Sequence, residues 1–146
     1  MPPTVELREI TQDSLQAVLD LAVEPEQEHY VATNARSIAE AHFEPRAWFR
    51  AVYADDDPVG FVMAYRDPPK QFWIWRFMID ARLQGEGYGR RALELLVDEA
   101  RKDGVGEVRL SYHPGDNSPH AFYVRCGFVE TGEVEGDEVV MRLPLD

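Results

Sequence analysis

The sequence predicts one α/β domain of the mixed α+β kind over residues 1–146, with a central sheet of about six to seven strands flanked by helices. Short apolar runs of strand length recur between turn residues, and one long segment has apolar residues at helical spacing. Residues 72–112 read strand, glycine-rich loop, helix, strand, which requires a right-handed crossover between parallel strands. The expected order is β-α-α-β-β-β-α-β-α-β-β, and 146 residues suffice for a buried core.

The first third of the chain predicts one strand and two helices. Residues 5–10 alternate apolar and charged side chains, as a short strand does. Thr11 and Asp13 are N-cap candidates for a helix whose apolar residues run from Leu15 to Ala22 before Pro25 ends the pattern. A second short helix is expected to begin near Asn34 or Ser37 and to end before Pro45.

The middle of the chain predicts a hairpin and a central strand. Residues 48–54 and 59–65 are strand-like, and the turn 55–58 between them contains three aspartates and a proline. Residues 72–79, FWIWRFMI, are apolar on both faces. Such a run suits a strand in the middle of a sheet that is covered on both sides.

The last third predicts two helices and three strands. The helix 90–102 carries an apolar stripe and ends at Gly104, and a strand follows at 107–112. Ser118 suits the cap and Pro119 the first position of a short helix that ends at Gly127. Residues 128–134 and 139–145 are expected to form a final hairpin around EGDE, Glu135 to Glu138.

Composition limits the classes of function. The net charge of −12 argues against nucleic-acid binding, which needs a basic face. The same charge is compatible with a cationic small substrate, although an acidic surface can also serve solubility alone. The N-terminus lacks the pattern of a signal peptide, no apolar run reaches the ~20 residues of a membrane span, and Cys126 is the single cysteine. We therefore expect a cytoplasmic protein that binds neither membrane nor nucleic acid, and the histidine spacing predicts no metal site.

The glycine-rich loop is the strongest functional signal. Glycines alternate in Gln84–Gly89 and lead directly into a helix, whose N-terminus attracts anions such as phosphate. The loop lacks the last glycine of a dinucleotide-binding fingerprint and the Lys-Ser or Lys-Thr of a Walker A loop. The alternative is a flexible turn that only lets a helix pack on the sheet.

Two motifs resemble the GNAT superfamily, the Gcn5-related N-acetyltransferases. Gln84–Gly89 matches the signature Q/R-x-x-G-x-G/A, with the aliphatic Ile79 five positions earlier, but Ala81 stands where the family commonly has proline. Downstream, Tyr123 and the pair Gly127-Phe128 match a second family motif. Asp116 holds that motif's usual Asn position, and Asn117 lies one residue late, so which of the two takes the Asn role stays open. Three segments resemble more narrowly the BltD-like spermine/spermidine acetyltransferase branch: PEQEHYVATN, WIWRFMID and GEVEGDEVVMRL.

The resemblance implies acetyl-CoA as cosubstrate. Backbone N–H groups of the loop would bind the pyrophosphate, and the end of the strand 72–79 would pair with the pantetheine arm and donate to the thioester oxygen. The implied cofactor-binding residues are Met78, Ile79, Gln84, Gly85, Glu86, Gly87, Tyr88, Gly89, Arg90, Asn117 and Tyr123.

The resemblance also implies acyl transfer to an amine. Tyr123 would be the catalytic general acid that protonates the leaving thiolate, while the alternative is a core tyrosine. The strand 72–79 has no carboxylate, so the general base stays open among Glu26, Glu28, His29 and a chain of waters. Glu26, Glu28 and Trp75 are the expected acceptor-binding residues, although the tryptophan suits the core as well.

The expected function is an acetyl-CoA-dependent N-acetyltransferase that acts on a small cationic amine, with a polyamine as first choice. An aminoglycoside, an amino acid or a protein N-terminus is the alternative acceptor. A non-catalytic acyl-CoA-binding module is the alternative from another class, because the fourth strand has no carboxylate. The family often forms dimers, so the resemblance adds a homodimer as one state to test.

Overall fold

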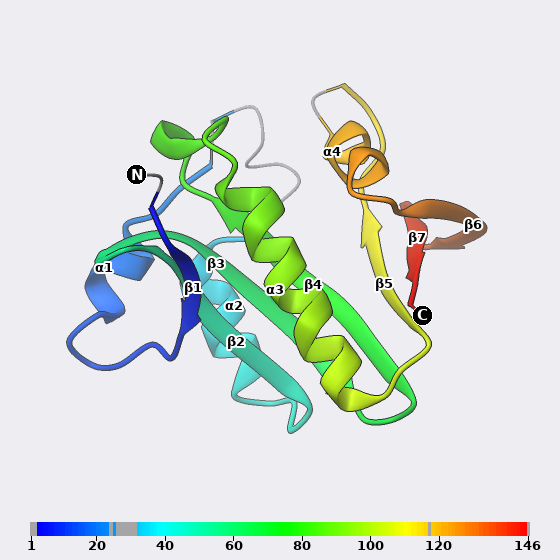
Figure 1. The fold of residues 1–146 in the computed structure, drawn as a ribbon, viewed down its shortest axis with the longest axis horizontal. Helices are drawn as coiled ribbons and strands as arrows, with labels where there is room; N and C mark the ends of the chain where they lie inside the picture. Colours follow the sequence, from blue (N-terminus) through cyan, green and yellow to red (C-terminus); the bar gives the residue numbers. More distant parts are fainter. Residues whose placement is uncertain (1–2, 24, 26–31, 117, 146) are drawn as a thin grey trace.

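The computed structural model describes residues 3–23, 25, 32–116 and 118–145, which form a mixed sheet covered by helices on both faces (Figure 1). The sheet has seven strands in the order β1-β2-β3-β4-β5-β7-β6. In chain order, the elements are β1 (Val5–Arg8), α1 (Leu15–Leu19), α2 (Asn34–Ala41), β2 (Ala47–Ala54), β3 (Asp57–Asp67), β4 (Gln71–Ile79), the 3₁₀ helix η2 (Ala81–Leu83), α3 (Tyr88–Asp103), β5 (Glu107–Tyr112), α4 (His120–Arg125), β6 (Val129–Glu135) and β7 (Glu138–Pro144). The predicted fold class and element order are confirmed.

Three predicted helix starts are wrong in detail. The N-cap of α1 is Ser14 rather than Thr11 or Asp13, because Thr11 and Ser14 bond to each other's backbone N–H groups in the preceding turn. Pro119 is the N-cap of α4 and not its first helical residue. The helix predicted over 90–102 begins two residues earlier, at Tyr88, since Gly87 takes the cap position. Local propensity locates a helix more reliably than it locates the end of one.

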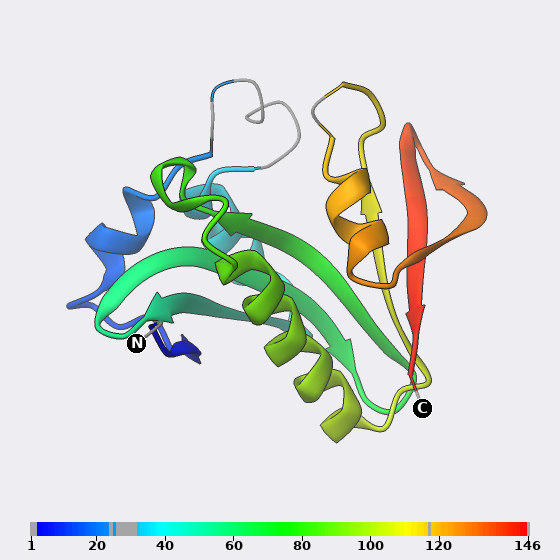
Figure 2. The same cartoon turned by 45° about the horizontal axis from the view of Figure 1, so that its top comes forward.

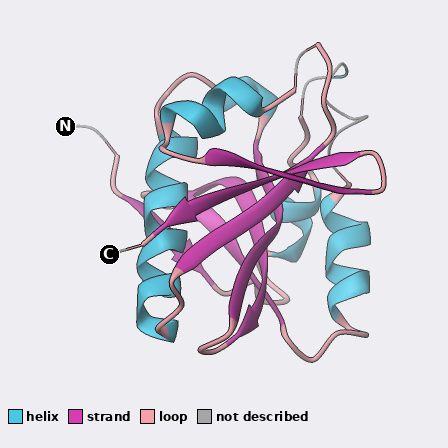
Figure 3. Ribbon diagram, turned by 90° about the vertical axis from the view of Figure 1, so that its right-hand side faces the viewer, coloured by secondary structure: helices cyan, strands magenta, loops and turns pink. Residues whose placement is uncertain are grey.

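Helices cover both faces of the sheet. α3 and the short helix α4 lie on one face, and α1 and α2 lie against the other (Figures 1 and 3). The apolar stripe predicted for α3 is buried, and it packs against inward residues of β3, β4 and β5. A smaller cluster on the other face joins Val18 and Leu21 to Phe61, Met63 and Met78. The strand β4 therefore lies between two apolar layers, as its sequence predicts.

Arg66 fastens the far end of α3 to the sheet. Its guanidinium donates to Asp103 at 2.5 Å and to Glu99 at 3.3 Å, and it also lies over the rings of Trp48 and Phe72. The hydrogen bond to Asp103 raises the pKa of Arg66, so the guanidinium stays charged. The C-terminal end of α3 is thereby held on β3, and its N-terminal end is directed toward the end of β4.

The parallel strands β4 and β5 pair over a short distance and then separate. Their register contains Trp73 with Arg109 and Ile74 with Leu110, and beyond these residues the two strands diverge (Figure 2). A register shift against β3 falls at the same point, since Met63 faces Arg76 while Ala64 faces Ile74. The extra residue, Trp75, forms a bulge that bends β4 away from β5.

The close approach of β3 to the end of β4 yields a test of the fold. A Cβ at Gly60 would lie 2.4 Å from the carbonyl oxygen of Met78 and 2.7 Å from the side chain of Ile79. Because a backbone carbonyl in a ladder cannot turn aside, we expect Gly60→Ala to lower the free energy of unfolding by about 1–3 kcal/mol. Urea denaturation measures the loss.

Gly106→Ala is the matched control, because a Cβ there meets nothing within 4 Å. An equal loss in the two variants would mean that the contact with β4 is not its cause, since the effect of Gly→Ala on the unfolded chain is to stabilise the folded protein.

Candidate active site

The divergence of β4 and β5 opens a cavity of about 920 Å³. Its walls come from the separated part of β4, the glycine-rich loop, the start of α3, the end of β5, α4 and the first residue of β7. The two sides of the opening are thus contributed by segments that are distant in sequence, and the C-terminal ends of β4 and β5 lie on opposite sides of it (Figure 2).

The glycine-rich loop presents its backbone to the cavity. Gly87 caps α3 with φ of +85°, a conformation that L side chains rarely adopt, and no side chain caps this helix. A Cβ on Gly85 or Gly87 would meet nothing within 4 Å, so open space lies beside the backbone at both positions. The first N–H groups of α3 therefore face a space that can hold an anion.

Two side chains hold this loop at the end of β4. The amide of Gln84 donates to the carbonyl oxygen of Ile79 at 3.0 Å. The buried carboxylate of Asp80 accepts from the backbone N–H of Ala22 and Arg82 and from the Arg82 side chain. Burial acts to raise the pKa of Asp80, but these hydrogen bonds outweigh it and the pKa is lowered. Nothing in the local sequence pattern predicted this anchoring role of Asp80, because its partner Ala22 lies 58 residues away.

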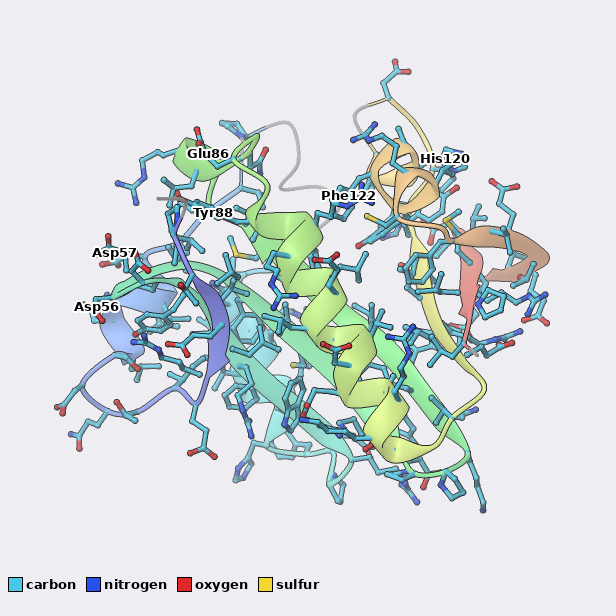
Figure 4. The ribbon with its side chains drawn as sticks, in the orientation of Figure 1. Asp56, Asp57, Glu86, Tyr88, His120 and Phe122 are labelled. Atoms are coloured by element: carbon cyan, nitrogen blue, oxygen red, sulfur yellow. The ribbon has the colours of Figure 1, made fainter. Side chains whose placement is uncertain are left out.

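Most of the predicted cofactor-binding residues lie around the cavity. Those that line it are Met78, Ile79, Gln84, Gly85, Gly87, Tyr88, Gly89, Arg90 and Tyr123. Glu86 is exposed at the tip of the loop and is not among the lining residues (Figure 4). Asn117 lies outside the described residues.

These residues fit a CoA thioester. The loop and the helix start suit the pyrophosphate, and the guanidinium groups of Arg90 and Arg125 lie on the same cavity. From Ile79 back to Ile74 the strand β4 runs roughly 16 Å beside the cavity at a rise of about 3.3 Å per residue. Beyond Ile74, which pairs with Leu110, the β5 edge of β4 is not paired with β5, so an extended arm could add to it as a strand does.

The short helix α4 forms the opposite wall. Phe122 lies on the side of α4 that faces the start of α3, where its ring would touch a Cβ on Gly89 (Figure 4). On the outer side, the hydroxyl of Tyr112 lies 2.7 Å from His120 Nδ1, which fastens α4 to β5. The Oε1 atom of Glu130 on β6 lies 3.4 Å from the Tyr112 hydroxyl oxygen and 3.5 Å from His120 Nδ1.

Tyr123 is placed between the core and the cavity. Its side chain is 7% exposed and its ring contacts those of Phe77, Phe122 and Phe128. Burial raises the pKa of the Tyr123 hydroxyl far above its ordinary value, with a smaller contribution from Cys126. The phenol is therefore protonated throughout the physiological range. The ring contributes to the core, as the alternative of a core tyrosine expected.

The side of the cavity toward α2 has its own set of side chains, which we call the α2-side wall: Trp75, Arg76, Ser111, His113 and Glu138. Trp75 was predicted at the acceptor site, and it does line the cavity. The other four were not predicted. Glu138 was expected only as part of the turn of the final hairpin. The predicted acceptor residues Glu26 and Glu28, and the candidate base His29, lie outside the described residues.

Charges on the α2-side wall are balanced locally. Arg76 donates to the carboxylate of Glu40 on α2 at 3.2 Å, and Arg36 binds the same carboxylate at 2.7 Å. Burial lowers the pKa of Arg76, while Glu40 and Glu138 act in the opposite direction. The Nε atom of Arg76 is buried without a hydrogen-bond partner among the described residues. Its position beside Trp75, at the bulge, explains why β4 can carry an arginine here.

Known proteins resemble this chain over its whole length. The profile of the Acetyltransferase (GNAT) family matches residues 5–128. A spermine/spermidine N(1)-acetyltransferase of Bacillus subtilis (strain 168) is 29% identical over 155 aligned residues, which cover 95% of this chain and 98% of the relative.

Solved structures agree with the fold. An acetyltransferase of Thermus thermophilus superposes with a TM-score of 0.77 at 23% identity, over 99% of this chain and 100% of that one. The PaiA N-acetyltransferase of Thermoplasma acidophilum, solved in complex with coenzyme A, gives a TM-score of 0.74 at 17% identity, over 97% and 99% of the two chains. The predicted arrangement of strands and helices is therefore one that known acetyltransferases adopt.

The open space beside Gly87 leads to a test of the phosphate-binding loop. We expect Gly87→Val to weaken CoA binding about tenfold or more, equivalent to about 1.4 kcal/mol, because its side chain would enter the space in front of the helix N-terminus. Because φ is positive at this position, valine there should also lower the free energy of unfolding by about 1–2 kcal/mol through backbone strain. Calorimetric titration with CoA measures the affinity.

Gly132→Val is the matched control for this strain. Gly132 has the same φ of +85° and equally open surroundings, but it lies on β6 and does not line the cavity. It should lose similar stability and keep its CoA affinity. Unchanged affinity in folded Gly87→Val would reject the loop as the phosphate site.

Proposed function

Because the chain belongs to the acetyltransferase (GNAT) family, we propose that it acetylates a primary amine of a small cationic acceptor, with a polyamine such as spermidine or spermine as substrate. Family membership confirms the prediction of an acetyl-CoA-dependent N-acetyltransferase. The identity of the amine is the part proposed here. The observation that supports it most is the likeness to the Bacillus polyamine acetyltransferase, which extends over 95% of this chain and so includes the acceptor side.

Charge and surface chemistry support a cationic acceptor. The chain carries a net charge of −12, which attracts a polycation over several ångströms in solution. On the α2-side wall the two positive charges of Arg36 and Arg76 are opposed by the two carboxylates of Glu40 and Glu138, so they do not make this part of the cavity strongly basic. The indole of Trp75 offers a face to an alkylammonium group.

The residues of the cavity divide the work of transfer. When bound, acetyl-CoA supplies a thioester carbonyl that an amine can attack. Backbone N–H groups of residues 85–90 would hold the pyrophosphate, and the end of β4 would align the arm and donate to the carbonyl oxygen. Tyr123 would give its proton to the sulfur as the carbon–sulfur bond breaks. The burial of Tyr123 keeps water from competing for that proton.

The proposed acceptor is tested by free-thiol release with an amine panel. Spermidine and spermine should support the highest kcat/KM, and their KM should rise with salt because screening weakens long-range attraction. The panel also contains an aminoglycoside, an amino acid and an N-terminal alanine peptide. Higher turnover of a neutral or anionic acceptor, with no salt dependence, would reject the polyamine.

The proton donor is tested by Tyr123→Phe. The substitution keeps the ring contacts of the core and removes the hydroxyl, so we expect kcat to fall about 10²–10⁴-fold while CoA affinity and the thermal midpoint change little. Pre-steady-state kinetics must establish that chemistry is the slow step. A wild-type rate in that regime would make Tyr123 a structural residue. Phe122→Leu, on the same helix, controls for altered packing of α4.

A further inference from the structure

The separation of β4 and β5 locates the reacting end of the cavity. Ile74 and Leu110 form the last pair of the parallel ladder, so the wedge between the strands is closed at this point and open toward the glycine-rich loop. An arm whose phosphate lies at the loop must direct its other end toward the closed end. The first residue of β5 beyond the closed end is Ser111.

Ser111 faces the α2 side of the sheet. Its neighbours Leu110 and Tyr112 belong to the core beneath α3, and side chains alternate between faces along a strand. Arg76 lies on the same side, as its ion pair with Glu40 of α2 requires. The amine must therefore approach from this side, because α3 and its apolar stripe fill the other.

A carboxylate reaches this place from a different strand. Glu138, the first residue of β7, lines the cavity, and its Oε1 accepts a hydrogen bond from the Ser111 hydroxyl at 3.3 Å. Among the described residues that line the cavity, it is the one carboxylate. The negative charge of Glu138 also acts to raise the pKa of Arg76, so Glu138 lies within electrostatic reach of β4.

We infer that Glu138 is the general base of the reaction, the group that contacts the acceptor ammonium and takes its proton before the amine attacks. This inference rests on the proposed transfer to an amine. Ser111 is then a positioning residue that aims the carboxylate. The base that β4 does not carry is supplied by β7, two strands away in the sheet.

The protons balance over one turnover. A primary ammonium has a pKa of about 10.4, so only roughly one amine in 2,500 is unprotonated at pH 7. Glu138 accepts one proton, and the freed nitrogen lone pair forms the bond to the carbonyl carbon. The carbon–sulfur bond then breaks, and the sulfur receives the Tyr123 proton. The nitrogen, which is positively charged after bond formation, loses its second proton to solvent and becomes the neutral amide. Glu138 releases its proton to solvent and Tyr123 regains one, so that one proton is released per turnover.

His113 is the competing group on this wall. It lines the same cavity, and its Nδ1 lies 3.5 Å from a carboxylate oxygen of Asp137. Asp137 is 86% exposed, however, and His113 follows the end of β5, two residues farther from the closed end than Ser111. Several titratable and charged groups surround Glu138. They are Arg76 on β4, His113 and Asp137 beside it, Glu135 across the hairpin, and the pair Arg36–Glu40 on α2.

The test compares Glu138→Gln with Glu135→Gln. The two residues face each other across the β6–β7 hairpin, and each substitution removes one negative charge, but Glu135 does not line the cavity. With the best amine of the panel, Glu138→Gln should lower kcat/KM at neutral pH about 10²–10⁴-fold, and Glu135→Gln should not. The wild-type plot of kcat/KM against pH should have an acidic limb. In Glu138→Gln this limb should be absent, and kcat/KM should instead rise with the fraction of the amine that is unprotonated. His113→Asn should keep that acidic limb.

Two further readouts separate a base from a packing residue. A fluorinated ethylamine, whose ammonium pKa lies below the assay pH, needs no base, so Glu138→Gln should lose far less activity with it. Calorimetry with CoA present should show weaker binding of the polyamine to Glu138→Gln than to Glu135→Gln. If Glu138→Gln fails to fold, Glu138→Asp, which keeps the charge but withdraws the carboxylate, should show a partial loss of rate.

The inference would be overturned if Glu138→Gln and Glu135→Gln had the same pH profile and the same affinity for the amine. Loss of the acidic limb in His113→Asn would assign the base to His113. Failure of the proposed acceptor is a separate result, since it appears in the wild-type protein as higher turnover of another acceptor or as no turnover with any amine of the panel. If no amine is turned over, Glu138→Gln and Glu135→Gln can still be compared by their rates of acetyl-CoA hydrolysis, because attack by water needs a base as well.

Discussion

The short parallel pairing of β4 with β5 is the constraint on which the rest of the structure depends. A parallel ladder continued to the ends of both strands would close the sheet and leave no cavity between them. The bulge at Trp75 ends the ladder after Ile74 and Leu110, and the two halves of the sheet then diverge. The cavity, its unpaired strand edge and the separation of its two walls all follow from this one irregularity.

Each half of the divergent sheet is fastened at its own rim by polar contacts. Asp80 ties the end of β4 to the segment after α1, and Gln84 ties the glycine-rich loop to Ile79. On the opposite rim, the Tyr112–His120 contact holds α4 against β5. The buried Asp80 carries a desolvation cost, which three hydrogen bonds offset, so the anchor is directional as well as stable.

The distribution of charge differs between the surface and the cavity. The chain is strongly acidic, whereas the cavity is lined by Arg90 and Arg125 at its cofactor end and by Arg76 on the α2-side wall. The arginines at the cofactor end suit an anionic phosphate, while Arg76 is neutralised by Glu40. An acidic exterior can thus attract a cationic acceptor while the interior binds an anionic cosubstrate.

The sequence by itself determined the order of the elements, the central position of β4 and the glycine-rich turn of Gln84–Gly89 that leads into α3. These features depend on local periodicity and on backbone conformations that glycine alone takes easily, and both can be read from neighbouring residues. Only the tertiary structure decided that Glu138 and Ser111 meet on the α2-side wall, that Asp80 anchors the loop and that Glu86 points away from the cavity. Ser111 and Glu138 are 27 residues apart and belong to strands joined through α4 and β6, so their contact depends on sheet order and register. No local pattern encodes that register, because it is set by the packing of side chains from the whole chain.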